Sequence, residues 1–394
     1  MNKIKKFSKS YIMPTYGDRD LCFERGKGCY LYTSSGIKYL DFAGGIAVNS
    51  LGHCHPNLVN VLKKQSQTLW HTSNLYKNYN QELFAKELCD KTFADKVFFS
   101  NSGAEAIECG LKVIKSYWHL KNKSKKNIIT FKNAFHGRTF AALSAQKNKR
   151  YSSAFTPLLP GFINIAFNDE KILKKNINNK TAAILIEPIQ GEGGINPASI
   201  SYLRFLRDIC NKKNILLFFD EVQSGFGRSG KLYSYEWANI KPDIVATAKG
   251  IGSGFPLGAC LTTNKASIGM TKGMHGSTYG GNPLAISVGR EVLKIISNKS
   301  FLKNVDLMAR YLWKNLKKLE KKYDEIIEIR GVGLLLGIKT KQNNVFISNL
   351  LKKNKLLNVP AGDNVIRLAP PLIITKKHID EAINIINDTF KNIR

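Results

Sequence analysis

The chain has 394 residues, 43% apolar and 23% charged, a globular balance that excludes a disordered or fibrous protein. Its net charge of +31 would suit nucleic-acid binding, but the lysines are spread along the chain without a nucleic-acid-binding motif, so we expect no nucleic-acid partner. No apolar run approaches the roughly 20 residues of a membrane span, and the basic N-terminus lacks the apolar segment of a secretory signal, so we expect a cytoplasmic protein without a membrane partner.

The middle of the chain alternates apolar runs of strand length with helical patterns. A helix is expected from about 105 to 118, and another before 215, where Leu203, Leu206 and Cys210 recur at helical spacing. Continuous apolar runs indicate strands covered on both faces. We therefore predict an α/β fold with a mostly parallel sheet in a large domain at 51–290. The expected strands are 97–101, 127–131, 182–187, 215–221, 243–248 and 258–263.

The last hundred residues have a different pattern. A long Lys-rich helix is expected at about 284–322, followed by short strands and a final helix with one apolar face. We predict a smaller α+β domain at 291–394, completed by the N-terminal segment 1–50. The apolar face of the final helix carries Ile379, Ala382, Ile383, Ile386 and Phe390.

Two residues at predicted strand ends carry the strongest chemical signal. Asp220 ends the run ILLFFD, at the edge of the sheet where α/β proteins bind ligands. Lys249 follows the run DIVATA and precedes a glycine-rich segment. Burial lowers the pKa of a lysine, as imine formation requires, and a buried carboxylate needs a cationic partner such as a protonated pyridine nitrogen. Either residue alone could equally be an ordinary strand-end lysine or a capping aspartate.

Two small-residue motifs suggest anion binding. SNSGAEA places Ser102, Gly103 and Ala104 between a strand and a helix start, where backbone N–H groups and the helix dipole attract phosphate. HGSTYGGNP offers the hydroxyl groups of Ser277 and Thr278. Taken singly, the first motif could be a simple helix cap and the second a simple loop.

Further pairs of residues have a chemical and a plain structural interpretation. AFHGR supplies the ring of Phe135 and the carboxylate-binding fork of Arg138, although these could be a core ring and a surface charge. His53 and His55 in GHCHP lack further ligands, so we expect a structural role and no metal site. The seven cysteines are scattered without a CxxC motif, which argues against disulfides and structural zinc.

Together these motifs resemble the class III aminotransferases of fold type I, and most of all the acetylornithine aminotransferases. The resemblance extends from ERGKG at residue 24 to RLAPPL at 367–372. Its runs are DFAGGIAVNSLGHCHP, NSGAEA, AFHGRT, EPIQGEGG, DEVQSGFGRSG, the Lys249 segment and HGSTYGGNPLA.

The resemblance implies pyridoxal 5'-phosphate as cofactor, bound through an imine to Lys249, which also moves the proton. Asp220 would keep the pyridine nitrogen protonated, and Gln223 would bind the phenolic oxygen. The cofactor's phosphate would be bound in one subunit and reached by Thr278 of the other, so the resemblance implies a homodimer with shared active sites. The remaining cofactor-binding positions would be Ser102, Gly103, Ala104, Phe135 and Val222.

The resemblance also implies how two substrates share one site. Arg138, with Ser277, would bind the carboxylate far from the reacting carbon. Arg367 would bind the near carboxylate of 2-oxoglutarate, and Glu192 would cover Arg367 while the amino donor reacts. The implied reaction transfers the terminal amine of N2-acetyl-L-ornithine to 2-oxoglutarate in a ping-pong sequence, as in arginine biosynthesis.

The identity of the donor rests on fewer residues. Ornithine aminotransferases have a tyrosine where this chain has Gly45, so the missing side chain favours an acylated donor. Tyr16, near the position of a carboxylate-binding tyrosine in ornithine-type enzymes, blurs the distinction. Ornithine, succinylornithine, N-succinyl-diaminopimelate and 4-aminobutyrate stay open as donors, and a non-catalytic basic binding protein is the alternative from another class.

Overall fold

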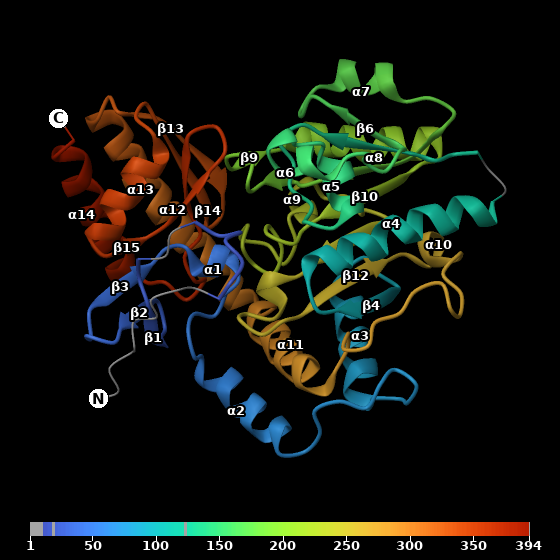
Figure 1. Ribbon diagram of the computed structural model, residues 1–394, viewed down its shortest axis with the longest axis horizontal. Helices are drawn as coiled ribbons and strands as arrows, with labels where there is room; N and C mark the ends of the chain where they lie inside the picture. The colour runs from blue at the N-terminus through green and yellow to red at the C-terminus, as the bar shows by residue number, and fades with distance from the viewer. Residues whose placement is uncertain (1–10, 18–19, 122–123, 394) are drawn as a thin grey trace.

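The computed structural model describes residues 11–17, 20–121 and 124–393 (Figure 1). Residues 1–10 and 18–19 of the expected N-terminal segment lie outside the described residues. A seven-stranded sheet forms the centre of the molecule, and the N-terminal strands lie beside the C-terminal elements (Figure 1).

The central sheet confirms the predicted α/β class. Its strand pairs are parallel except those of β12, which is antiparallel to both neighbours. In order across the sheet, the strands are β4 (Lys96–Ser100), β12 (Gly258–Thr262), β11 (Ile244–Thr247), β10 (Leu216–Asp220), β7 (Thr181–Ile186), β5 (Asn127–Phe131) and β6 (Phe162–Ile165).

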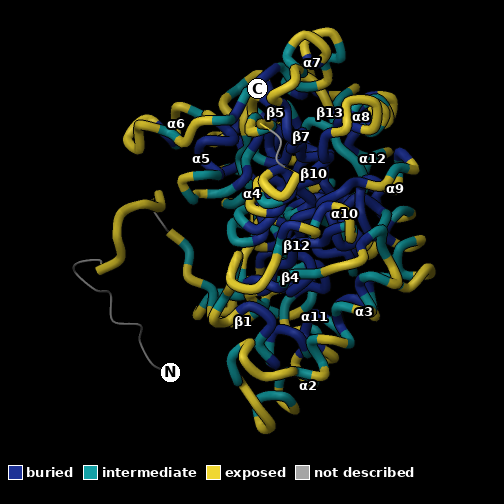
Figure 2. Tube along the Cα trace, turned by 90° about the vertical axis from the view of Figure 1, so that its right-hand side faces the viewer, coloured by how far each residue is buried: buried dark blue, intermediate teal, exposed yellow. Residues whose placement is uncertain are grey.

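Helices cover both faces of this sheet, which is why its strands are apolar throughout. Along β10, Leu217 and Phe219 pack in the core that includes α8 (Ile200–Lys213). Leu216 and Phe218 pack on the opposite face in the core that includes α4 (Gly103–Leu120). Successive residues of a strand point to opposite faces, so a strand between two helix layers has no polar side. Figure 2 shows β5, β7 and β10 within the buried centre.

The C-terminal part is built on an antiparallel sheet. β13 (Ile326–Val332), β14 (Leu335–Thr340), β17 (Val365–Leu368) and β16 (Val359–Ala361) pair in this order. The final helix α14 (Lys376–Lys391) buries Ile379, Ala382, Ile386 and Phe390 of the predicted apolar face, and Ile383 is partly buried. The other helices here are α12 (Lys299–Lys322) and α13 (Asn344–Lys353).

The N-terminal strands pair with one short C-terminal strand. β1 (Phe23–Lys27), β2 (Tyr30–Thr33) and β3 (Lys38–Asp41) are antiparallel, and β15 (Leu356–Leu357) runs parallel to β3. Chain segments more than 300 residues apart in sequence are thus joined by backbone hydrogen bonds, such as Leu40 N–H to Lys355 carbonyl at 2.9 Å.

The prediction of a single long helix at about 284–322 is wrong. Two helices occupy this stretch, α11 (Pro283–Ile296) and α12. The break occurs at Asn298, which has extended backbone and accepts the Ser300 N–H through its side chain, so it caps the second helix. Since α11 runs across residue 290 and contacts α2 (Pro56–Ser66), α3 (Tyr79–Lys91) and α12, the division at 290 stays a prediction.

The remaining elements are short. No helix in the described ranges is both long and apolar enough to span a membrane. The short remaining elements are α1 (Gly44–Ala47), α5 (Phe140–Gln146), α6 (Lys149–Ser152), α7 (Glu170–Asn176), α9 (Tyr235–Ala238), α10 (Asn264–Ser267), β8 (Ile189–Gln190) and β9 (Asn196–Pro197), with 3-10 turns at Ser153–Phe155 and Lys249–Ile251.

Candidate active site

A cavity of about 380 Å³ opens where the parallel strands of the central sheet end. The loops that follow β4, β5, β7, β10 and β11 all contribute to it, which is where α/β sheets place their ligands. Its lining residues are Val48, Asn101, Ser102, Gly103, Ala104, Phe135, His136, Gly137, Glu187, Glu192, Asp220, Val222, Gln223, Ala248, Lys249, Gly254, Phe255, Pro256 and Leu257.

Lys249 lies two residues beyond the end of β11 and lines the cavity. Its backbone has a φ of +49°, in the left-handed region that non-glycine residues seldom adopt. Burial, and next the Arg367 guanidinium, lowers the pKa of Lys249 to about 8. A larger fraction of its amine is therefore uncharged near neutral pH than in an ordinary lysine, whose pKa is about 10.4. This is the state in which an amine attacks a carbonyl.

Asp220, at the end of β10, is fixed by two donors. Its Oδ1 accepts the Val222 N–H at 3.1 Å, and its Oδ2 accepts from His136 Nδ1 at 2.8 Å. The side chains of Asp220 and His136 are both buried. A carboxylate has lone pairs for more than two donors, so Asp220 can also accept from a ring nitrogen in the cavity.

His136 was missed in the sequence, although it stands inside the AFHGR motif. Its backbone N–H donates to Gln146 Oε1 at 2.9 Å, and its Nε2 is buried without a partner in the described chain. The only signal was a histidine beside the predicted ring residue Phe135. Its contact with Asp220 depends on two strand ends 84 residues apart in sequence, which no local pattern reveals.

Glu187 is a second residue that sequence reasoning missed. It follows β7, lines the cavity and accepts the Phe135 N–H at 2.8 Å and the Gly191 N–H at 3.2 Å. Burial, and next the charge of Asp220, raises the pKa of Glu187 to about 7, with His136 opposing the shift. One carboxyl group thus joins the segment that carries Phe135 to the glycine-rich loop that carries Glu192.

The start of α4 forms the anion-binding end of the cavity. Ser102 caps this helix, its Oγ accepting the Glu105 N–H at 3.3 Å. Gly103 and Ala104 are the first helical residues, so their N–H groups have no partner within the helix and the positive end of its dipole lies at the cavity. A Cβ on Gly103 would lie 2.7 Å from Val222 Cγ1, so only glycine permits this close packing.

Arg367 approaches the same cavity from β17. Its side chain is 1% exposed, and its Nη1 donates to Glu192 Oε1 at 2.7 Å and to Gln223 Oε1 at 3.0 Å. Because Glu192 and Gln223 line the cavity, the guanidinium lies directly behind its wall. A buried guanidinium is costly without a counter-ion, and Glu192 supplies that charge.

Arg138 lies outside the cavity lining. Its side chain is exposed, and its guanidinium stacks 3.9 Å from the ring centroid of Tyr151 and 5.2 Å from that of Phe135. Phe135 lines the cavity, so its ring separates the Arg138 guanidinium from the cavity.

The residues expected in the 275–283 loop are also outside. Ser277 is near, because its Oγ accepts from Asn101 Nδ2 at 3.4 Å and Asn101 lines the cavity. Thr278 is exposed and lines a separate depression formed with residues 71–74. This chain's own Thr278 is therefore not part of the cavity.

Gly45 and Tyr16 are not among the residues that line the cavity. Gly45 is exposed, with a φ of +64°, and a Cβ there would meet Asn49 Nδ2 at 3.1 Å and Val48 Cβ at 3.6 Å. Only Val48 of these belongs to the lining. Tyr16 is 73% exposed near the start of the described chain.

Other features of the sequence have structural roles. Nε2 of His53 lies 2.7 Å from Asp41 Oδ2, and His55 precedes Pro56, the first residue of α2. Among the described residues, no group of three or more His, Cys, Asp or Glu side chains is arranged to hold a metal ion.

The residues at this cavity fit pyridoxal phosphate. The amine of Lys249 suits its aldehyde, the buried Asp220 its ring nitrogen, and the start of α4 its phosphate. At the carboxyl ends of a mostly parallel sheet, this set defines a pyridoxal-phosphate enzyme of fold type I.

Comparison with known proteins places the chain within that class. The model of the aminotransferase class-III family matches residues 12–390. The acetylornithine aminotransferase of Agrobacterium fabrum is 50% identical over 374 residues, 94% of each chain. The ornithine aminotransferase structure from Toxoplasma gondii has a TM-score of 0.94 at 30% identity, covering 97% of this chain and 93% of that one. The N-acetylornithine aminotransferase structure from Stenotrophomonas maltophilia has a TM-score of 0.85 at 33% identity, covering 96% and 98%.

This chain belongs to the class-III aminotransferase family. It is a transaminase that depends on pyridoxal phosphate, as the sequence predicted.

Proposed function

We propose that this protein transfers the terminal amine of N2-acetyl-L-ornithine to 2-oxoglutarate, giving N-acetyl-L-glutamate 5-semialdehyde and L-glutamate, a step of arginine biosynthesis. The observation that carries the proposal is the ion pair between Glu192 and the buried Arg367 beside the cavity. While this pair is closed, the carboxylate beside an α-amine would meet a guanidinium that Glu192 already neutralises, whereas a terminal amine has no carboxylate beside it. The named relative at 50% identity supports the same substrate.

The residues of the cavity divide the work of both half-reactions. The Lys249 amine would take the proton from the substrate carbon that bears the reacting nitrogen and would carry it in the transfer. Asp220, oriented by His136, would hold the proton on the ring nitrogen of the cofactor. When bound, pyridoxal phosphate supplies a conjugated ring that withdraws electrons from the substrate carbon.

The substrates are held at their carboxylate groups. Arg138 and Ser277 bind the carboxylate far from the reacting carbon in both half-reactions. Arg367 binds the near carboxylate of 2-oxoglutarate after Glu192 turns away, and a bidentate guanidinium–carboxylate contact gives this step its geometry. Phe135, Val222 and Gln223 would contact the ring of the cofactor, and Ser102, Gly103 and Ala104 would hold its phosphate.

We further propose a homodimer in which Thr278 completes the partner's phosphate site. Asn74 Nδ2 donates to the carbonyl groups of Ser277 and Gly280 at 2.9 Å, so the segment before α3 and the Thr278 loop form one surface. Exposed apolar side chains gather along this surface, which is typical of subunit contacts. They are Leu69, Trp70, Leu75, Tyr76, Tyr79 and Tyr279.

We propose that the protein functions in the cytoplasm. All seven cysteines are free thiols in the structure. Disulfide-free proteins with several cysteines are typical of reducing compartments.

Free ornithine is the second candidate donor, because the Toxoplasma gondii ornithine aminotransferase structure matches this fold with a TM-score of 0.94. A panel assay separates the candidates: 2-oxoglutarate with N2-acetyl-L-ornithine, N2-succinyl-L-ornithine, N-succinyl-diaminopimelate, L-ornithine and 4-aminobutyrate. We expect the acylated diamino acids to have the highest kcat/KM. Faster turnover of L-ornithine or 4-aminobutyrate would move the function to that donor.

A further inference from the structure

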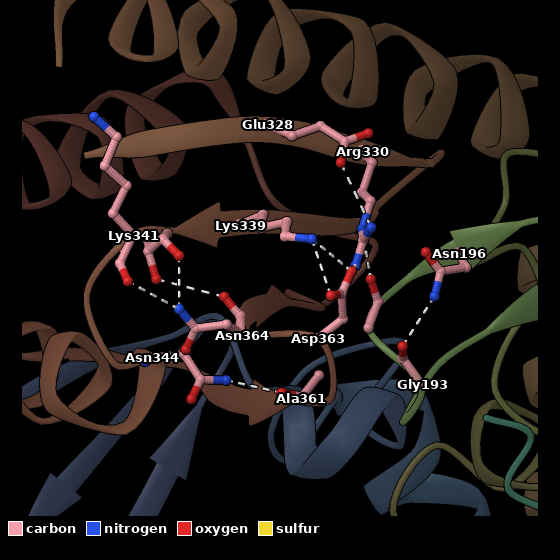
Figure 3. A network of polar contacts seen from close by, with 12 residues as sticks. Gly193, Asn196, Glu328, Arg330, Lys339, Lys341, Asn344, Ala361, Asp363 and Asn364 are labelled. Carbon is pink, nitrogen blue, oxygen red and sulfur yellow. Dashed lines mark hydrogen bonds and ion pairs between the residues drawn. The ribbon is translucent and has the colours of Figure 1, made fainter. Parts of the chain in front are cut away.

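The loop that carries Glu192 lies against the C-terminal part of the chain, and Figure 3 shows its next residue, Gly193, near Arg330 and Asp363. The Gly362 N–H donates to the Glu192 carbonyl at 2.8 Å. Arg330, on β13, donates from Nε to the Gly194 carbonyl at 2.7 Å. Two hydrogen bonds therefore fix the main chain at 192–194, while the Glu192 side chain extends to Arg367.

The two segments touch backbone to backbone. A Cβ on Gly194 would lie 2.6 Å from the Gly362 carbonyl oxygen and 2.7 Å from Arg330 Nη2. The Gly194 backbone also has a φ of +107°, which side-chain-bearing residues rarely adopt. No side chain fits between the loop and Arg330, so any displacement of Arg330 acts directly on the loop backbone.

Arg330 is itself fixed by a carboxylate. Its Nη2 lies 2.8 Å from Asp363 Oδ2, and Lys339 Nζ lies 2.9 Å from Asp363 Oδ1 (Figure 3). The Arg330 side chain is 13% exposed, so solvent screens its contacts less than those of a surface pair. Lys339 shares this carboxylate, and among the described residues the hydrogen bonds of its side chain go to Asp363 and not to the Glu192 loop.

We propose that Arg330 is a positioning residue for substrate selection. By fixing the Gly194 carbonyl, it holds the loop so that the Glu192 carboxylate stays on Arg367 while a terminal amine reacts. Release of Arg367 is then a rotation of the Glu192 side chain on a fixed backbone. This proposal rests on the proposed function, because it assigns Glu192 the task of covering Arg367.

The test compares Arg330→Gln with the matched control Lys339→Gln in the holoenzyme. The measured quantity is the ratio of kcat/KM for L-glutamate, an α-carboxylate amine, to kcat/KM for N2-acetyl-L-ornithine in the amine-donating half-reaction. We expect this ratio to rise about fivefold in Arg330→Gln, since the lost bond has a charged donor. It stays within about twofold of the wild-type value in Lys339→Gln. An equal loss for both amines in Arg330→Gln, with the ratio unchanged, overturns the proposal.

A readout independent of activity is amide hydrogen exchange of the segment 189–196 in the cofactor-free protein. Exchange becomes faster in Arg330→Gln and not in Lys339→Gln if Arg330 anchors the loop; equal exchange in both contradicts the anchoring. Asp363→Asn, which removes the nearer of the two carboxylates that contact Arg330 and leaves Glu328 at 3.5 Å, replaces Arg330→Gln if that variant does not fold and is expected to raise the ratio too. If the wild type fails to use N2-acetyl-L-ornithine, the proposed function fails while the exchange measurement still decides the anchoring.

Discussion

Arg367 and Glu192, 175 residues apart in the chain, form an ion pair of 2.7 Å beside the cavity that Lys249 lines. Gln223 accepts from the same guanidinium nitrogen at 3.0 Å. When Glu192 leaves, Arg367 therefore keeps one neutral partner that holds its position but does not cancel its charge. In the proposed function, Glu192 therefore covers a cation that stays in place when the Glu192 side chain turns away.

Replacing Glu192 by Gln is expected to weaken the discrimination between a terminal amine and an amine next to a carboxylate. Arg367 would then lack its counter-charge in both half-reactions and attract α-carboxylates throughout. We predict a rise of about tenfold in kcat/KM for L-glutamate relative to N2-acetyl-L-ornithine. Rapid-mixing kinetics of the two half-reactions measure this ratio. An unchanged ratio would show that Arg367 is not the cation that Glu192 controls.

Replacing Lys249 by Ala removes the amine that we propose binds the cofactor and moves the proton. Loss of a positioned acid–base group costs about 10²–10⁴-fold, so kcat is predicted to fall by at least that factor. Borohydride reduction followed by peptide mass spectrometry checks the attachment. We expect label on the Lys249 peptide in the wild type and none in Lys249→Ala. Label on another lysine would contradict the assignment.

The lowered pKa of Lys249 predicts how cofactor loading depends on pH. A pKa of about 8 means that the amine is mostly protonated below pH 8 and mostly neutral above it, so the loading rate of the cofactor-free protein rises through about pH 8. Glu192 raises this pKa by attraction, so Glu192→Gln shifts the midpoint to lower pH. Loading rates measured by absorbance between pH 6 and about 10.4, the ordinary lysine value, give the midpoint. A midpoint near that upper limit would refute the effect of burial.

The contact between His136 and Asp220 predicts that two substitutions of His136 weaken cofactor binding to different extents. His136→Ala removes the Nδ1 donor and should weaken cofactor binding by about tenfold, since a buried hydrogen bond to a carboxylate is lost. His136→Asn places an amide donor near the same point and should recover most of the affinity. Cofactor dissociation constants from fluorescence titration decide the matter. Equal weakening in both variants would assign His136 a packing role only.

If the two subunits of a dimer share each active site, as proposed, two variants that are inactive alone should regain activity when they form mixed dimers. In a mixed dimer of Lys249→Ala and Thr278→Arg subunits, one site carries both changes and the other carries neither. With random mixing, half of the dimers are mixed and have one intact site each, so recovery approaches about a quarter of wild-type activity. The assay follows activity after the two variants are co-expressed. No recovery, with mixed dimers confirmed by mass spectrometry, would place each site within one subunit.

The sequence predicted the parts of this molecule that local patterns encode. Apolar runs revealed the central strands, and the ordered motifs pointed to Lys249 and Asp220, which line one cavity. The break at Asn298 was missed, because Lys-rich helical spacing continues across it and a single capping side chain ends the pattern.

Contacts made across the fold were beyond sequence reasoning. His136 meets Asp220, and Glu187 joins Phe135 to Gly191, only because separate strands end at one edge of the sheet. The bond from Arg330 to the Glu192 loop likewise depends on how the C-terminal sheet docks on the large one.

The most direct test of the proposed function is the steady-state rate with N2-acetyl-L-ornithine and with free L-ornithine, each with 2-oxoglutarate. The closed pair of Glu192 and Arg367 favours the terminal amine, which both donors have, whereas the missing side chain at Gly45 predicts a preference of at least about tenfold in kcat/KM for the acetylated donor. L-Glutamate should form in equal amount to the semialdehyde. Equal or faster turnover of free ornithine would contradict the account.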